Sequence, residues 1–284
     1  MTGHVFAVAS GKGGVGKTTT AVNAAAAMAE SGRSVVLVDY DLGMANLGAV
    51  LTVEPAAATL HDVLAGDAET LDAVGSAPGD LDVMVGGTDI EDFGRADPSK
   101  LRDVAADLRE AYDVVVVDTG GGLSHDTTVP LGLADDVLLV STPQGAALEN
   151  TAKTLALAER VGGEVAGLVL TRVSGSVDTE DSVADLDVPL LGSIPEDGGV
   201  ADSEEAGEPL VVFAEESPAA QSYRELGYEL LGESPPLSFQ NDDEEASAAA
   251  GAALAEVADE PGTRGSPSLL SRVTGGLLGS NGKD

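Results

Sequence analysis

The stretch that most constrains this fold is residues 11–18, GKGGVGKT, which match the phosphate-binding pattern G-x-x-x-x-G-K-[ST] at every fixed position. The apolar residues 4–9 before it are typical of a buried strand, and the alanine-rich residues 19–31 after it are typical of a helix. Backbone N–H groups and the helix dipole favour phosphate oxygens at such a turn. The motif therefore predicts a nucleotide site, in which Lys17 reaches the β- and γ-phosphates and the Thr18 hydroxyl completes a Mg²⁺ shell.

The same loop carries a second lysine, Lys12, which an ordinary P-loop does not need and which by itself indicates only a solvated charge. The whole string GKGGVGKTT resembles the deviant Walker A motif of the MinD/ParA family. The resemblance implies ATP and Mg²⁺ as cofactors, catalytic roles for Lys12 and Lys17, and a homodimer in which Lys12 reaches the partner's nucleotide. The loop residues expected at the nucleotide are Gly11, Lys12, Gly13, Gly14, Val15, Gly16, Lys17, Thr18 and Thr19.

Two carboxylates, Asp39 and Asp41, follow the apolar strand expected over residues 34–38. In a parallel α/β sheet, ligands bind at the carboxyl ends of the strands. Residues 39–48, DYDLGMANLG, resemble the first switch of the family, D-x-D-x-G-x-x-N-L. The resemblance implies that Asp39 supports the Mg²⁺ shell and that Asp41 orients the attacking water; the alternative is a solvated acidic loop.

Four consecutive valines precede Asp118, and such a run is typical of a central parallel strand that is buried on both faces. An aspartate after such a strand matches the Walker B pattern, whose carboxylate holds Mg²⁺ through water. Residues 118–122, DTGGG, resemble the second switch D-x-P-A-G, which implies that the Gly122 N–H senses the γ-phosphate. Gly120 and Gly121 replace the usual Pro-Ala, and their extra backbone entropy predicts slower or more partner-dependent hydrolysis.

Two later segments resemble the elements that frame adenine in this family. Thr171 and Arg172 end an apolar strand expected over residues 165–172, with threonine at the usual asparagine position. Arg172 could stack on the base or hydrogen-bond to it. Residues 188–197 resemble the I-P-x-D segment, which implies base contacts from Pro195, Glu196 and Asp197.

Alternating apolar strands and helical segments predict a doubly wound, mostly parallel α/β sheet over residues 1–232. This is the P-loop fold of the MinD-like (SIMIBI) nucleotide-binding proteins, which the resemblance implies over about residues 3–232.

The composition restricts the possible partners and chemistry of the chain. Its 14 basic and 49 acidic residues give a formal net charge of −35, which argues against direct nucleic-acid binding. Such a charge resembles the surfaces of halophilic proteins, where molar salt screens self-repulsion. The lack of cysteine excludes disulfides and cysteine-ligated clusters. The histidines His4, His61 and His125 are isolated in sequence and receive no assigned role.

The tail is expected to be a disordered acidic linker over residues 233–265, followed by an amphipathic helix over residues 266–279. Five aliphatic residues fall within one half of the helical wheel, namely Leu269, Leu270, Val273, Leu277 and Leu278. The segment resembles the membrane-targeting helix of MinD proteins. Docking on a partner protein and a frayed tail are the alternatives.

The resemblance implies an ATP hydrolase, slow and stimulated by a partner, whose ATP-bound homodimer associates reversibly with the membrane. It would position the division machinery or another cellular structure through an activating or cargo protein. Because no signal peptide or long apolar run is recognisable, the expected location is the cytoplasm and the inner face of the cell membrane. The alternatives are a ParA-like partition ATPase, a nucleotide-gated interaction module with little hydrolysis, and, less favoured, an amidase or ligase component.

Overall fold

A computed structural model of the chain describes residues 2–88, 94–122, 125–175 and 179–236, all of which belong to one compact unit. The last helix in this range ends at Leu230, close to the domain end predicted at residue 232. The predicted linker is described only as far as residue 236, and the predicted amphipathic helix over residues 266–279 lies outside the described residues. Both therefore remain predictions.

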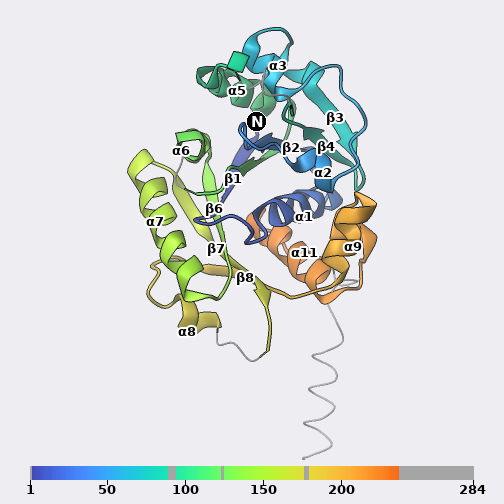
Figure 1. Ribbon diagram of the computed structural model, residues 1–284. Coiled ribbons are helices and arrows are strands. Elements are labelled where there is room, and N and C mark those ends of the chain that lie inside the picture. The colour runs from blue at the N-terminus through green and yellow to red at the C-terminus, as the bar shows by residue number, and fades with distance from the viewer. Residues whose placement is uncertain (1, 89–93, 123–124, 176–178, 237–284) are drawn as a thin grey trace, which may run out of the picture. The chain divides into compact units, whose positions relative to one another are not determined.

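Eight strands form one sheet in the described part of the chain, in the order β3-β4-β2-β5-β1-β6-β7-β8 (Figure 1). All neighbours are parallel except β3 and β4. The strands are β1 (His4–Ala9), β2 (Val35–Tyr40), β3 (Val74–Ala77), β4 (Leu81–Met84), β5 (Val114–Thr119), β6 (Asp136–Ser141), β7 (Glu164–Val173) and β8 (Leu190–Pro195). The valine run of β5 thus lies beside β1 in the middle of the sheet, as expected for a strand buried on both faces.

The helices between the strands cover both faces of the sheet. They are α1 (Lys17–Glu30), α2 (Leu47–Val50), α3 (Leu60–Ala65), α5 (Leu101–Ala111), α6 (His125–Leu133), α7 (Gly145–Val161), α8 (Thr179–Val183), α9 (Gly199–Ala206), α10 (Leu210–Phe213) and α11 (Pro218–Leu230), with 3₁₀ turns η1 (Thr70–Ala73) and η2 (Pro98–Lys100). None of the helices in the described ranges has the length and apolarity needed to cross a bilayer.

Side chains of β1 alternate between the two faces of the sheet because successive residues of a strand point to opposite faces. Phe6 and Val8 pack in the core formed with α1 and α11. Val5 belongs to a second core with α3 and α5, and Ala7 to a third with α6 and α7. The doubly wound, mostly parallel α/β fold predicted from the sequence is confirmed.

The antiparallel edge strand β3 was not predicted, because its sequence VGSA has neither an apolar alternation nor a β-branched run. It pairs with β4, with Val74 opposite Met84. The Glu54 N–H donates to the Ser76 carbonyl over 2.8 Å, so residues 53–56 cover part of its outer edge. A Cβ on Gly75 would lie 2.4 Å from the Glu54 carbonyl oxygen, so only glycine permits this close approach.

Arg224 of α11 is a buried cation that joins three helices. Only 2% of its surface is exposed. Its Nε donates to the Glu30 carboxylate of α1 over 2.9 Å, and its Nη atoms donate to the carbonyls of Val211 in α10 and of Glu215. The guanidinium thus satisfies the buried Val211 carbonyl and two acceptors that are only partly buried.

We expect Arg224→Met to lower the free energy of unfolding by about 3 kcal/mol, because it leaves a carboxylate and two carbonyls without this donor. The matched control is Arg33→Met, which breaks an exposed ion pair with Glu233 and should leave the stability almost unchanged. Urea unfolding followed by circular dichroism measures both changes. Equal losses in the two variants would show that Arg224 is not the link between these helices.

Candidate functional site

The P-loop joins β1 to α1 and turns tightly before the helix. Gly14 and Gly16 have φ values of 76° and 87°, in the left-handed region that favours glycine. A Cβ on Gly16 would also lie 3.5 Å from the Thr171 hydroxyl oxygen, so β7 packs closely behind the loop. Because α1 begins at Lys17, two residues before the predicted start, its first N–H groups lie within the phosphate-binding motif.

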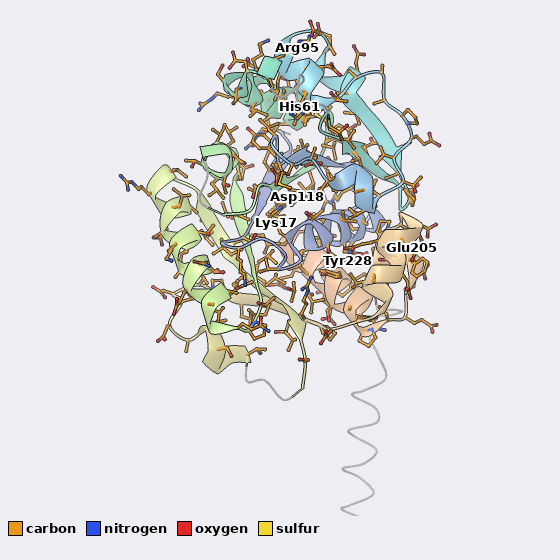
Figure 2. The ribbon with its side chains drawn as sticks, viewed as in Figure 1. Lys17, His61, Arg95, Asp118, Glu205 and Tyr228 are labelled. Carbon is orange, nitrogen blue, oxygen red and sulfur yellow. The ribbon has the colours of Figure 1, made fainter. Side chains whose placement is uncertain are left out.

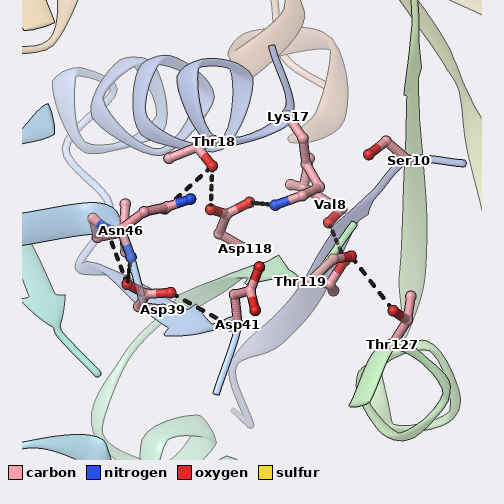
Figure 3. A network of polar contacts seen from close by, with 12 residues as sticks. Val8, Ser10, Lys17, Thr18, Asp39, Asp41, Asn46, Asp118, Thr119 and Thr127 are labelled. Carbon is pink, nitrogen blue, oxygen red and sulfur yellow. Dashed lines mark hydrogen bonds and ion pairs between the residues drawn. The ribbon is translucent and has the colours of Figure 1, made fainter. Parts of the chain in front are cut away.

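The Lys17 side chain extends to the carboxyl end of β5, where its Nζ forms an ion pair with Asp118 (Figure 3). The Thr18 hydroxyl donates to the other oxygen of that carboxylate over 2.7 Å. Asp118 has no exposed surface and Lys17 has only 8%. Figure 2 shows the pair in the middle of the molecule. The structure therefore brings together three residues that the sequence predicted to act on phosphate and Mg²⁺.

Asp39 and Asp118 are register partners at the carboxyl ends of β2 and β5. Burial raises the pKa of Asp39 to about 6, although N–H groups of Leu47 and Asn46 oppose this rise. Burial also raises the pKa of Asp118, in spite of the opposing Lys17 charge. A cation between them would stabilise both ionised carboxylates.

The oxygens of Thr18, Asp39 and Asp118 fit Mg²⁺, which prefers hard oxygen ligands and is usually held by one or two carboxylates together with substrate phosphates. The described residues contain no group of three or more His, Cys, Asp or Glu side chains arranged to hold a metal. This donor set is therefore suited to a cation that arrives with phosphate ligands.

Asp39 also shapes the first switch, because its Oδ2 accepts hydrogen bonds from the N–H groups of Asn46 at 2.8 Å and Leu47 at 2.9 Å. Asp41 lies two residues further on, and its carboxylate accepts from the Met44 N–H over 3.1 Å. A Cβ on Gly120 would lie 3.5 Å from the Asp41 carboxylate carbon. The structure thus places the predicted water-orienting residue beside the second switch.

The second switch contacts the P-loop through glycines. A Cβ on Gly121 would lie 3.6 Å from the Gly13 backbone. Gly122 has a φ of 93°, and its N–H donates to the Ser10 carbonyl over 3.1 Å. For the predicted role of Gly122 at the γ-phosphate, this bond would have to open. The Ser10 hydroxyl donates to the Lys12 carbonyl, and the Lys12 residue itself is exposed.

A cavity of about 270 Å³ adjoins the P-loop at Gly16 and Thr19. The four residues predicted at adenine all line it, namely Arg172, Pro195, Glu196 and Asp197. Arg172 has a φ of 53°, a conformation that is uncommon for a residue other than glycine. Thr171 replaces the family's asparagine, and its hydroxyl, which has one proton to donate, lies within hydrogen-bonding distance of the carbonyls of Val15 and Ser141. It therefore ties β7 to the P-loop.

Two polar residues of this cavity, Glu204 and Tyr223, were missed by the sequence reasoning. Glu204 of α9 accepts a hydrogen bond from the Thr19 hydroxyl over 2.8 Å, across 185 positions of sequence. Tyr223 of α11 also lines the cavity, and burial raises its pKa to about 12. No local pattern distinguishes Glu204 from the many other carboxylates of this chain.

The fold and this site define a P-loop nucleotide-binding protein. Residues 6–210 match the family model described as the CobQ/CobB/MinD/ParA nucleotide binding domain. The chain is 36% identical over 231 residues to an ATP-binding protein of Methanocaldococcus jannaschii, with 80% of this chain and 87% of that protein covered. It is 29% identical over 246 residues to the septum site-determining protein MinD of Bacillus subtilis, with 83% and 91% covered.

Among solved structures, the chain is similar to MinD of Pyrococcus horikoshii complexed with Mg-ADP. That match has a TM-score of 0.76 and 35% identity, and it covers 80% of this chain and 95% of the other. The chain therefore belongs to the CobQ/CobB/MinD/ParA family of nucleotide-binding domains. The family resemblance seen in the sequence is confirmed, whereas the roles of the individual site residues remain predictions.

A double-mutant cycle on Lys17 and Asp118 tests whether their ion pair supports the fold as well as the ligand. We expect Lys17→Met to lower the free energy of unfolding by about 3 kcal/mol, because Asp118 is left buried without its cation. The pair Lys17→Met with Asp118→Asn should cost clearly less than the sum of the two single changes. Urea unfolding measures stability, and titration with a fluorescent ADP analogue measures binding.

Binding of the analogue with Mg²⁺ should be lost in all three variants, including the one whose stability recovers. Lys153→Met removes an exposed lysine of α7 and should alter neither the free energy of unfolding nor the binding of the ADP analogue. Additive stability losses would contradict the structural role of the pair, and retained binding would contradict its role at the nucleotide.

Proposed function

We propose that this chain is a MinD-like ATPase whose ATP-dependent homodimer associates reversibly with the membrane. The observation that carries the proposal is the convergence of Lys17, Thr18, Asp39 and Asp118 at one point, with exposed Lys12 on the same loop. This arrangement supports phosphate and Mg²⁺ binding within one subunit and leaves a second lysine available for a partner.

In this proposal, phosphate oxygens of ATP replace Asp118 as the partner of Lys17. Asp118, Asp39 and the Thr18 hydroxyl would hold Mg²⁺, which supplies charge neutralisation at the β- and γ-phosphates when bound. Asp41 accepts hydrogen bonds from the attacking water and orients it. Lys17 and Lys12 stabilise negative charge that develops during phosphoryl transfer.

The cavity that adjoins Gly16 and Thr19 would hold the nucleoside. Arg172 would contact the base, and residues 195–197 would frame it. Glu204 lines this cavity and accepts a hydrogen bond from Thr19, which follows the phosphate-binding motif. A ribose hydroxyl could donate to this carboxylate.

Membrane association is proposed from the sequence of the tail. Two aliphatic helices in one dimer bind a surface more tightly than one helix does, because the second binding step becomes intramolecular. Arg272 is the single basic residue of the predicted helix over residues 266–279, so the helix has little attraction to anionic lipid. High salt screens that attraction further. Burial of aliphatic side chains would therefore drive the association.

Co-sedimentation with lipid vesicles in molar KCl tests the proposal on the full chain and on a chain that ends at Thr263. ATP should drive the full chain onto the vesicles, ADP should leave most of it in solution, and truncation should abolish sedimentation. Lys12→Ala should abolish the effect of ATP, because dimerisation depends on that lysine. The matched control is Lys153→Ala.

Sedimentation independent of both nucleotide and tail would overturn membrane association. Sedimentation that needs the tail but not ATP would overturn gating by the dimer. If the tail binds a protein in place of lipid, truncation would abolish binding to that partner protein and would leave binding to vesicles unchanged.

A nucleotide-gated module with little hydrolysis is the alternative, and the second switch favours it. Gly121 lacks a left-handed φ, and a Cβ there would make ordinary contacts at 3.6 Å, so alanine fits. We expect Gly121→Ala to stabilise the protein by about 0.4–1 kcal/mol and to raise the rate of ATP hydrolysis, because the switch loses less entropy on ordering.

Phosphate release and urea unfolding measure the two effects of Gly121→Ala. Gly122→Ala is the matched control. It should lower both the stability and the rate of ATP hydrolysis, because the φ of Gly122 is 93°. A ParA-like role in positioning cargo remains a further alternative, in which a DNA-binding partner would supply the contacts that this acidic chain lacks.

A further inference from the structure

His61 of α3 is a buried imidazole that links two loops, although it lies outside the nucleotide site. Only 1% of its surface is exposed. The Gly87 N–H donates to Nδ1 over 2.8 Å, and Nε2 lies 3.1 Å from the Leu42 carbonyl oxygen. Because Nδ1 accepts, the proton of the neutral ring must be on Nε2, which donates to Leu42. Both ring nitrogens are thus used, by partners on different segments.

The three segments meet without spare room. A Cβ on Gly86 would lie 2.6 Å from the Ala45 Cβ of the first switch and 3.4 Å from His61 Cε1. The Leu60 N–H donates to the Val85 carbonyl over 2.9 Å, which fixes the start of α3 to the end of β4. The imidazole therefore lies on a rigid support, and Figure 2 shows it near α3, apart from Lys17 and Asp118.

Leu42 is adjacent to Asp41, so the bond from His61 acts on the segment that carries the predicted hydrolytic carboxylate. Leu42 is 4% exposed, whereas Met44 two residues later is 77% exposed. The residues around Asp41 are thus anchored at Leu42 on one side and at Asp39 on the other. A shift of about 1 Å in such a residue is enough to slow a reaction strongly.

We propose that His61 is a positioning residue for ATP hydrolysis, which holds the first switch against Gly86 and Gly87 and so fixes Asp41. This inference rests on the proposed function, because it assumes that Asp41 orients the attacking water. It adds a connection from the hydrolytic segment to the loop that follows β4.

Steady-state ATP hydrolysis by His61→Leu and His61→Gln in the full chain tests the proposal. Leucine fills the space but cannot bond Leu42 or Gly87, so kcat should fall about tenfold or more. The KM for ATP and the affinity for ADP should stay within about twofold, because no atom of His61 lines the nucleotide cavity. Glutamine offers one donor and one acceptor and should restore at least about half of the wild-type kcat.

Thr59→Ala is the matched control, because it removes the capping box at the start of the same helix without touching Leu42. It should leave kcat within about twofold of wild type. An equal fall in kcat in Thr59→Ala, no rescue by glutamine, or an unchanged kcat in His61→Leu would each overturn the inference. Absence of hydrolysis in the wild type, or unchanged hydrolysis in Asp41→Ala, would overturn the proposed function instead.

Imidazole nitrogen NMR tests the contact itself without any catalysis. The chain contains three histidines, and His61→Gln identifies the signals of this one. The inference predicts the neutral ring with its proton on Nε2 in the wild type, and a change in these signals when the Mg-ATP analogue binds. A ring protonated on Nδ1, or signals that the nucleotide does not alter, would overturn it.

Discussion

The ion pair between Lys17 and Asp118 is the interaction on which the rest of the site depends, because it joins the first turn of α1 to the carboxyl end of β5. Neither charge is stable in the interior alone. The pair is possible because Thr18 completes the bonding of the carboxylate and because β1, which leads into the P-loop, lies beside β5 with Val8 opposite Asp118. A phosphate that binds Lys17 would therefore release Asp118 to a cation, so the two proposed ligands bind as a coupled pair.

Because the chain is strongly acidic, its few buried cations are particularly important for its stability. In molar salt the Debye length falls to about 3 Å, so exposed ion pairs such as Arg33 with Glu233 lose most of their attraction. Arg224 and Lys17 are 2% and 8% exposed, and screening affects them much less. The acidic surface and the buried pairs therefore serve different purposes: the surface keeps the protein soluble, and the pairs fix α1 and α11.

The parts of the molecule that could be predicted are those whose chemistry is encoded in neighbouring residues. Three segments each carry a local pattern: the P-loop, the valine run before Asp118 and the segment at Pro195. The structure places all three at the carboxyl ends of their strands. The edge strand β3 lacked such a pattern because its position depends on Glu54 and β4. Glu204 and His61 acquire partners only across long separations in sequence, so no local pattern could indicate them.

The first switch illustrates how a segment can be both fixed and responsive. Asp39 holds its C-terminal part through the N–H groups of Asn46 and Leu47, and the same carboxylate has a raised pKa because it is buried beside Asp118. A cation that stabilises Asp39 in its charged form strengthens these hydrogen bonds. His61 holds the segment from the opposite side through Leu42. Asp41 lies between Asp39 and Leu42 in the sequence, so its position depends both on the nucleotide site and on the contacts of His61, as the proposed hydrolytic switch would require.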